Sequence, residues 1–231
     1  MDEHSLAISF GNSLTEDVAE VVGEYAELGL DALVEDGLLK DIPLVSTAVT
    51  VYRIGKSIHE RHHVAKLISF LNEINKGVAD EEKRKNYREK FSNNENFRNK
   101  ELEYILVLID RYISFDKPAM LAKLYLAYLD DKIIWPEFTM YAEVVDRFLL
   151  FDAGKLISAN GETIVHRNIG GEYVLRLVAL GLMTEVTNTS AFVEGDNGNI
   201  SITMETLTRA VSTDKAYKRT EFGEKLADIL R

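Results

Sequence analysis

The amino-acid sequence predicts a mainly α-helical protein in two parts, a helical bundle over residues 1–153 and a small α+β module over residues 154–231. Two observations lead to this prediction. Apolar residues recur at intervals of three and four along most of the first part, which is the period of a helix with one buried face. After Gly154, glycines separate short helical segments from short segments with the composition of strands, which is typical of a mixed module.

The bundle is predicted to contain an acidic helix, a long helix and several shorter ones. Residues 15–35 are expected to form the acidic helix, because their apolar residues recur at intervals of three and four. Glu16 and Asp17 near its start interact favourably with the helix dipole. Residues 44–74 are expected to form one long helix, or two helices broken near Gly55. The remaining helices are expected at residues 80–91, 101–113, 116–131 and 133–151.

The C-terminal module is predicted to alternate helices and strands. A short helix ends at Gly181 and continues into a strand. Residues 199–206 and 215–220 have the composition of further strands. The closing helix follows Thr220, whose side chain is a favoured N-cap.

Segments of both parts resemble known groups of proteins. The pairing of LVALGLM with YKRTEFGEKLADIL resembles the winged-helix fold, in which a helix turns at Gly-Leu into the wing and the second wing strand leads into a T-x-x-G-x-x-L helix. The segments DGLLKDIPLVSTAVTVYRIGKSI and KLYLAYLDDKIIWPEF resemble an uncharacterised group of bacterial helical proteins. The second resemblance implies a regulatory protein or an accessory component of a bacterial phage-defence system, and lends no known activity.

Composition excludes several classes of protein. The chain has no cysteine, which excludes a disulfide scaffold, a thiolate zinc site and a cysteine nucleophile. The N-terminus is acidic and lacks the basic and apolar regions of a signal peptide, so a cytoplasmic location is expected. We find no phosphate-binding loop, no dinucleotide motif and no G-x-S-x-G motif, and therefore expect no cofactor and identify no small-molecule substrate.

The distribution of charge predicts contacts between segments. Residues 53–100 carry a net charge of +5 and residues 101–154 a net charge of -5, so we expect acidic and basic elements to lie against each other or against a partner. The run EEKRKNYREKF is interpreted as the solvated face of a helix. Contact of this run with RNA, with a membrane surface or with the acidic first helix is left open.

The stretch SIHERHHVAKL contains H-E-x-x-H at His59, Glu60 and His63. On a helix, the two histidines share one face and could bind zinc, with Glu60 as a base toward a zinc-bound water. A catalytic site also needs a third ligand and a dry apolar shell. Charged Arg61 between them favours an exposed helix face, so we expect no metal and keep a zinc hydrolase as an alternative.

The winged-helix resemblance leaves DNA binding and protein docking open. In a DNA complex the helix EYVLRLVALG would enter the major groove with Arg176 as its one basic side chain. Lys218 and Arg219 would add contacts from the wing. Because duplex binding draws on several phosphate contacts, the sequence favours protein docking.

Residues 42–52, IPLVSTAVTVY, are the longest nearly uncharged stretch. A membrane span needs about 20 apolar residues, so this stretch is too short to cross a bilayer as a straight helix. A buried core segment is the favoured interpretation. In the alternative, a membrane-active effector, Val45, Val49 and Val51 would enter the bilayer.

These observations predict a non-enzymatic, cytoplasmic protein that binds a protein partner or a second copy of itself. A DNA-binding winged-helix regulator, a membrane-active effector and a zinc hydrolase are the alternatives.

Overall fold

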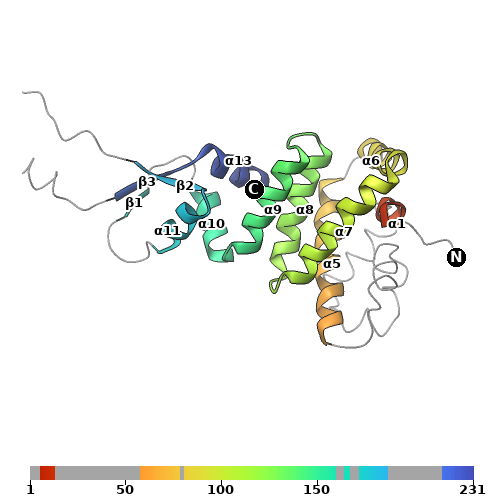
Figure 1. Ribbon diagram of the computed structural model, residues 1–231, viewed down its shortest axis with the longest axis horizontal. Helices are drawn as coiled ribbons and strands as arrows, with labels where there is room; N and C mark the ends of the chain where they lie inside the picture. Colours follow the sequence, from red (N-terminus) through yellow and green to blue (C-terminus); the bar gives the residue numbers. More distant parts are fainter. Residues whose placement is uncertain (1–5, 14–57, 79–80, 160–163, 167–171, 187–214) are drawn as a thin grey trace, which may run out of the picture. The chain divides into compact units, whose positions relative to one another are not determined.

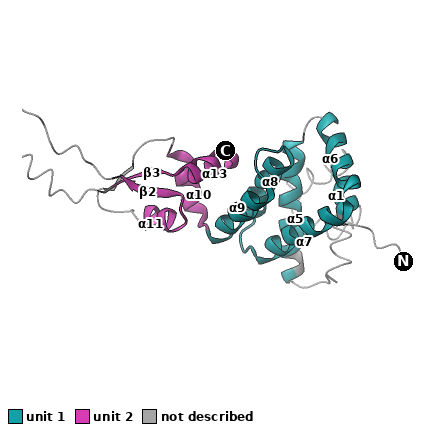
Figure 2. Cartoon of the chain, turned by 45° about the horizontal axis from the view of Figure 1, so that its top comes forward, with its two compact units in different colours: residues 1–147 teal, residues 148–231 magenta. Residues whose placement is uncertain are grey.

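A computed structural model describes residues 6–13, 58–78, 81–159, 164–166, 172–186 and 215–231. The chain divides into two compact units, Met1–Arg147 and Phe148–Arg231 (Figure 2). The described residues are mainly helical, as the sequence predicts, with one small antiparallel sheet in the second unit.

The first unit is a helical bundle. Its core is built on α8, which lies between α5 and α9 and also contacts α7, while α1 packs against α6 and α7 (Figure 1). The described helices are α1 (Leu6–Asn12), α5 (Ile58–Gly77), α6 (Glu81–Asn93), α7 (Glu95–Arg111), α8 (Asp116–Leu129) and α9 (Trp135–Arg147).

Aromatic rings hold four of these helices together. Tyr125 of α8 is fully buried, and its ring centroid lies 5.9 Å from that of Phe10, 6.4 Å from that of Phe70 and 5.8 Å from that of Phe138. Such pairs contribute roughly 0.5–1.5 kcal/mol each beyond the apolar area they bury. Tyr125 therefore links α8 to α1, α5 and α9.

The predicted helices at residues 80–91, 101–113 and 116–131 are confirmed as α6, α7 and α8. Their ends differ by at most two residues, except that α7 begins six residues earlier than predicted, at Glu95. The prediction of one helix over residues 133–151 is wrong. The helix α9 ends at Arg147, Leu149 is extended (φ -85°, ψ 138°), and α10 (Leu150–Ser158) follows. No glycine or proline marks this break, and the apolar pattern continues through it.

The boundary between the units falls earlier than the predicted boundary at residue 153. The prediction divided α10, whereas α10 lies wholly in the second unit because it packs against α11 and α13. The short helix α1 was not predicted. The predicted helix at residues 15–35 and the start of the long helix, residues 44–57, lie outside the described residues.

The second unit is a small α+β unit. Its elements are α10, β1 (Ile164–His166), α11 (Glu172–Ala179), β2 (Met183–Val186), β3 (Lys215–Arg219) and α13 (Glu221–Leu230). The strands are antiparallel in the order β1-β3-β2. Strands were predicted where β2 and β3 lie, but β1 was not predicted, and the predicted strand at residues 199–206 lies outside the described residues.

The turn after α11 is locked onto the start of α13. Gly181 has a φ of +73°, a conformation that glycine adopts readily, and so ends α11. The Thr220 hydroxyl donates to the Gly181 carbonyl at 2.7 Å and accepts from the Gly223 N–H at 3.0 Å. The backbone N–H of Thr220 donates to the Leu182 carbonyl at 3.0 Å. The predicted N-cap at Thr220 is therefore confirmed.

Candidate functional site

The basic side chain of α11 is held by a buried carboxylate. The Arg176 guanidinium donates from Nε and Nη2 to the two carboxylate oxygens of Asp152 on α10, at 2.6 Å and 2.7 Å. Asp152 is only 1% exposed. A bidentate pair of this kind is a strong, geometrically specific interaction. Arg176 therefore joins α11 to α10, and its Nε and Nη2 donors are already used by Asp152.

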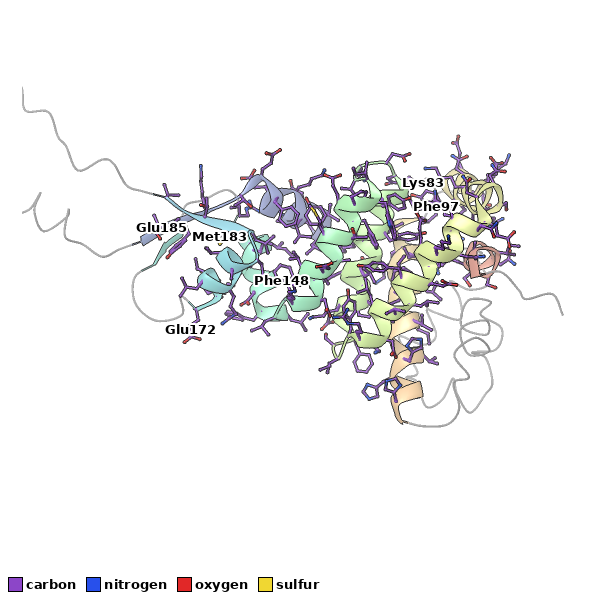
Figure 3. The ribbon with its side chains drawn as sticks, in the orientation of Figure 1. Lys83, Phe97, Phe148, Glu172, Met183 and Glu185 are labelled. Carbon is purple, nitrogen blue, oxygen red and sulfur yellow. The ribbon has the colours of Figure 1, made fainter. Side chains whose placement is uncertain are left out.

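The outward face of α11 is acidic and apolar. Glu172, labelled in Figure 3, is 93% exposed, and its carboxylate lies 3.9 Å from Arg176 Nη1 one turn along the helix. Leu175 is 56% exposed. Ala179 is exposed one turn further along. These residues are three and four apart and therefore share one face of the helix. We call Glu172, Leu175 and Ala179 the outer face of α11.

An exposed aromatic contact borders α11 on α10. Phe151 is mostly exposed, and its ring meets that of Tyr173 edge to face with centroids 6.2 Å apart. The Lys155 ammonium lies 5.2 Å from the centroid of the Phe151 ring. Exposed aromatic side chains of this kind are frequent anchors at protein interfaces.

The two basic candidates on β3 lie on opposite faces of the sheet, because side chains alternate along a strand. Lys218 is exposed, whereas Arg219 is buried. The three residues proposed for DNA contact are therefore not brought together: Arg176 is paired with Asp152, and Arg219 is largely withdrawn from solvent.

The histidines of the H-E-x-x-H motif share a carboxylate on α7. Asp110 Oδ1 lies 3.6 Å from His59 Nε2 and 3.2 Å from His63 Nδ1. The described residues contain no group of three His, Asp or Glu side chains that could hold a metal ion. The side chain of Glu60 is outside the described part, so a zinc site would need ligands that the described residues do not supply.

His63 is not on a solvated face, in contrast to the prediction for this segment. It is 4% exposed, whereas His59 and His62 are exposed. Burial lowers the pKa of His63, although the Asp110 carboxylate raises it and nearby Lys66 lowers it further. The histidine therefore resists protonation within the fold.

Lys66 lies one turn further along α5 and is also buried. Its ammonium donates to the backbone carbonyls of Asp110 at 2.7 Å and Tyr112 at 2.8 Å. Burial lowers the pKa of Lys66, and the charge of Asp110 opposes this change. The ammonium closes the C-terminal end of α7, where unpaired carbonyls carry negative partial charge.

The basic run of α6 contacts the end of α8. Lys83 lies 3.3 Å from the Asp130 carboxylate, and Lys90 donates to the Leu129 carbonyl at 2.8 Å and to Asp131 at 3.1 Å. The predicted contact between basic and acidic segments is confirmed here. Lys83 and Lys90 remain 45% and 37% exposed, so they are solvated as predicted and also pair with the end of α8. Arg84 of the same run is buried, in contrast to the prediction.

A hollow of about 470 Å³ lies between α6 and the end of α8. Burial raises the pKa of Asp130, but hydrogen bonds from Tyr87 and the neighbouring lysines outweigh it, so its pKa lies below the usual value. Asp130 is therefore ionised and pairs with lysine. The hollow is lined by Lys83, Asn86, Tyr87, Glu89, Lys90, Asn93, Asn94, Leu129 and Asp130.

The membrane candidates Val45, Val49 and Val51 lie in residues 42–52, outside the described residues. Among the described helices, none is long and apolar enough to cross a bilayer.

Comparisons with protein-family models, with curated proteins and with solved structures gave no match.

Sequence reasoning missed the partners of the candidate residues. Asp152 lies 24 residues before Arg176, and Asp110 lies 44 residues after Lys66, so no local spacing links them. The one signal in the sequence was the charge alternation, which predicted contacts between segments without identifying the side chains.

Proposed function

We propose that the chain is a non-enzymatic protein-interaction protein whose second unit is a winged-helix-like module that docks a protein partner. The observation that carries the proposal is the Arg176–Asp152 pair. Because Arg176 is the one basic side chain of α11 and is held by Asp152, it is not available to contact a DNA base or phosphate. The outer face of α11 then offers a carboxylate and aliphatic groups.

The negative charge on the outer face of α11 disfavours binding to nucleic acid. Phosphate neutralisation by lysine and arginine supplies most non-specific affinity for DNA, and a carboxylate at the front of the reading helix repels the backbone. Between β1 and β2 the described residues contain one helix, α11, whereas a helix-turn-helix reader needs two helices joined by a short turn. Both observations favour protein docking over the DNA-binding alternative.

The exposed apolar groups fit a protein partner. Leu175 on α11 and Phe151 on α10 are both more than half exposed, and the polar groups Glu172 and Lys155 lie near them. Protein interfaces commonly combine an apolar centre with a polar rim. A cytoplasmic location and a part in bacterial phage defence are proposed from the sequence alone.

The test is an affinity pull-down of the tagged full-length chain from lysate of its native cell, with and without nuclease, read by mass spectrometry. We expect a stoichiometric protein that survives nuclease and is lost with Leu175→Glu, because a second carboxylate on this face opposes apolar docking. Met140→Glu is the matched control, since Met140 is a similarly exposed apolar side chain on a helix of the first unit.

Equal recovery with both variants would place docking elsewhere on the chain and overturn the proposal for α11. Material that disappears with nuclease and depends on Lys218 would favour the DNA-binding regulator instead. Light scattering of the purified chain separates self-association from a different partner.

A further inference from the structure

Arg219 is a buried cation, and two of its donor atoms have no acceptor among the described residues. It lies on the central strand β3, opposite Met183 of β2, and is 8% exposed. Its Nε and Nη1 atoms are buried, and neither has a hydrogen-bond partner among the residues that the structure describes. Arginine stays protonated in proteins, so this guanidinium is charged in the folded unit.

Other arginines of the chain show what such a group normally contacts. Arg176 in the same unit pairs with both oxygens of Asp152. Arg98 in the first unit donates to Glu101 at 2.6 Å and also lies over aromatic rings. A buried charge without a counter-charge strongly destabilises a fold, and buried charges are therefore paired. Arg219 departs from this rule.

We propose that Arg219 receives a carboxylate from the protein partner. This inference rests on the proposed function and adds the chemistry of the partner: an acidic side chain or a chain terminus that enters beside β3. A planar carboxylate matches the guanidinium fork and gains charge-assisted hydrogen bonds there.

The surroundings favour a single carboxylate over a nucleic-acid backbone. Lys218 points to the opposite face of the sheet, so it cannot join Arg219 on one phosphate. An arginine that is 8% exposed also admits only a small group.

The test measures amide hydrogen exchange of β2 and β3 by mass spectrometry in the full-length chain. Sodium acetate serves as the carboxylate probe, and sodium chloride at equal ionic strength is the reference. A ligand that binds only the folded state slows exchange by about twofold when its concentration equals its dissociation constant. We expect such slowing by acetate in the wild-type chain and none in Arg219→Met.

Arg176→Met is the matched control, because it removes the paired arginine of the same unit. This variant leaves buried Asp152 without its arginine partner, so hydrogen exchange should be faster in every buffer, while the response to acetate persists. Arg219→Met should leave exchange in chloride unchanged or slower, because it removes an uncompensated charge. Arg219→Lys should keep the fold and lose most of the acetate response.

Three results would overturn the proposal. One is an equal response to acetate and chloride in the wild-type chain. Another is faster exchange, or failure to fold, in Arg219→Met, since the chain itself would then supply the partner of Arg219. The third is a larger response to inorganic phosphate than to acetate. None involves Leu175 or a captured partner, so failure here is distinct from failure of the docking proposal.

Discussion

The ends of α7, α8 and α9 in the bundle and the end of α11 in the α+β unit are closed by different means. In the bundle, lysines from neighbouring helices donate to the last carbonyls of a helix: Lys66 at the end of α7, Lys90 at the end of α8 and Lys117 at the end of α9. In the α+β unit, the turn between α11 and β2 depends on two glycines. Gly181 supplies the positive φ of the turn, and Gly223, which has no Cβ atom, allows the start of α13 to contact the Leu182 backbone.

The difference predicts different sensitivities. A helix end that is closed by an ammonium depends on a charge and on the hydrogen bonds that this charge strengthens. A turn that is closed by glycine depends on the absence of a Cβ atom. Changes of side-chain size should therefore damage the turn after α11 most, and changes of charge or pH should damage the ends of α7, α8 and α9.

The largest expected effect is that of Gly223→Ala. A Cβ atom at this position would lie 2.0 Å from the Leu182 carbonyl oxygen, which is backbone and cannot rotate away. We expect the free energy of unfolding of the second unit to fall by more than about 4 kcal/mol. Hydrogen exchange of β2, β3 and α13 should rise to nearly unprotected rates.

Gly154→Ala is the control for this substitution. Gly154 lies at an exposed position of α10, and a Cβ there meets no atom within 4 Å. Alanine in a helix interior is more favourable than glycine by about 1 kcal/mol, so this variant should be slightly more stable. Trp135 is the only tryptophan of the chain and lies in the bundle, so its fluorescence should be unchanged in both variants. Equal protection in the two variants would contradict the tight fit at Gly223.

The local part of this architecture could be predicted from the sequence. Thr220 acts on the N–H three residues later, and Gly181 sets its own backbone, so both features are written in adjacent residues. The long-range pairs could not be predicted. Nothing local distinguishes buried Asp152 from an exposed helix-end aspartate, or buried Lys66 from the solvated lysines of a basic segment.

The charge-based closure is tested by Lys66→Met. Methionine keeps most of the apolar stem but leaves the Asp110 and Tyr112 carbonyls without their ammonium donor. Leaving buried acceptors unsatisfied costs about 1–3 kcal/mol each, so with two acceptors we expect the bundle to lose about 2–6 kcal/mol in denaturant unfolding followed by Trp135 fluorescence.

Lys90→Met is the matched control at the end of α8. Its ammonium donates to a single carbonyl and is more exposed, so the loss should stay below about 1 kcal/mol. A loss at Lys66 no greater than that at Lys90 would show that burial does not strengthen this closure.

The smallest expected effect is a pH dependence confined to the bundle. His63 packs beside Lys66 and Asp110, and its pKa in the fold is lowered from 6.5, chiefly by burial. The unfolded chain therefore binds a proton more readily, and the stability of the bundle should fall as pH decreases through 6.5. One proton limits the slope to about 1.4 kcal/mol per pH unit.

His63→Gln should flatten the decline in Trp135-monitored unfolding between pH 7 and pH 5, while His62→Gln, at an exposed position, should leave it unchanged. Two outcomes would contradict this prediction: a parallel loss of stability in His63→Gln and the wild-type chain, or an equal slope in the protection of β2 and β3. In either case the acid sensitivity would not arise from the buried histidine and lysine at the end of α7, and the contrast between the two units would lose its physical basis.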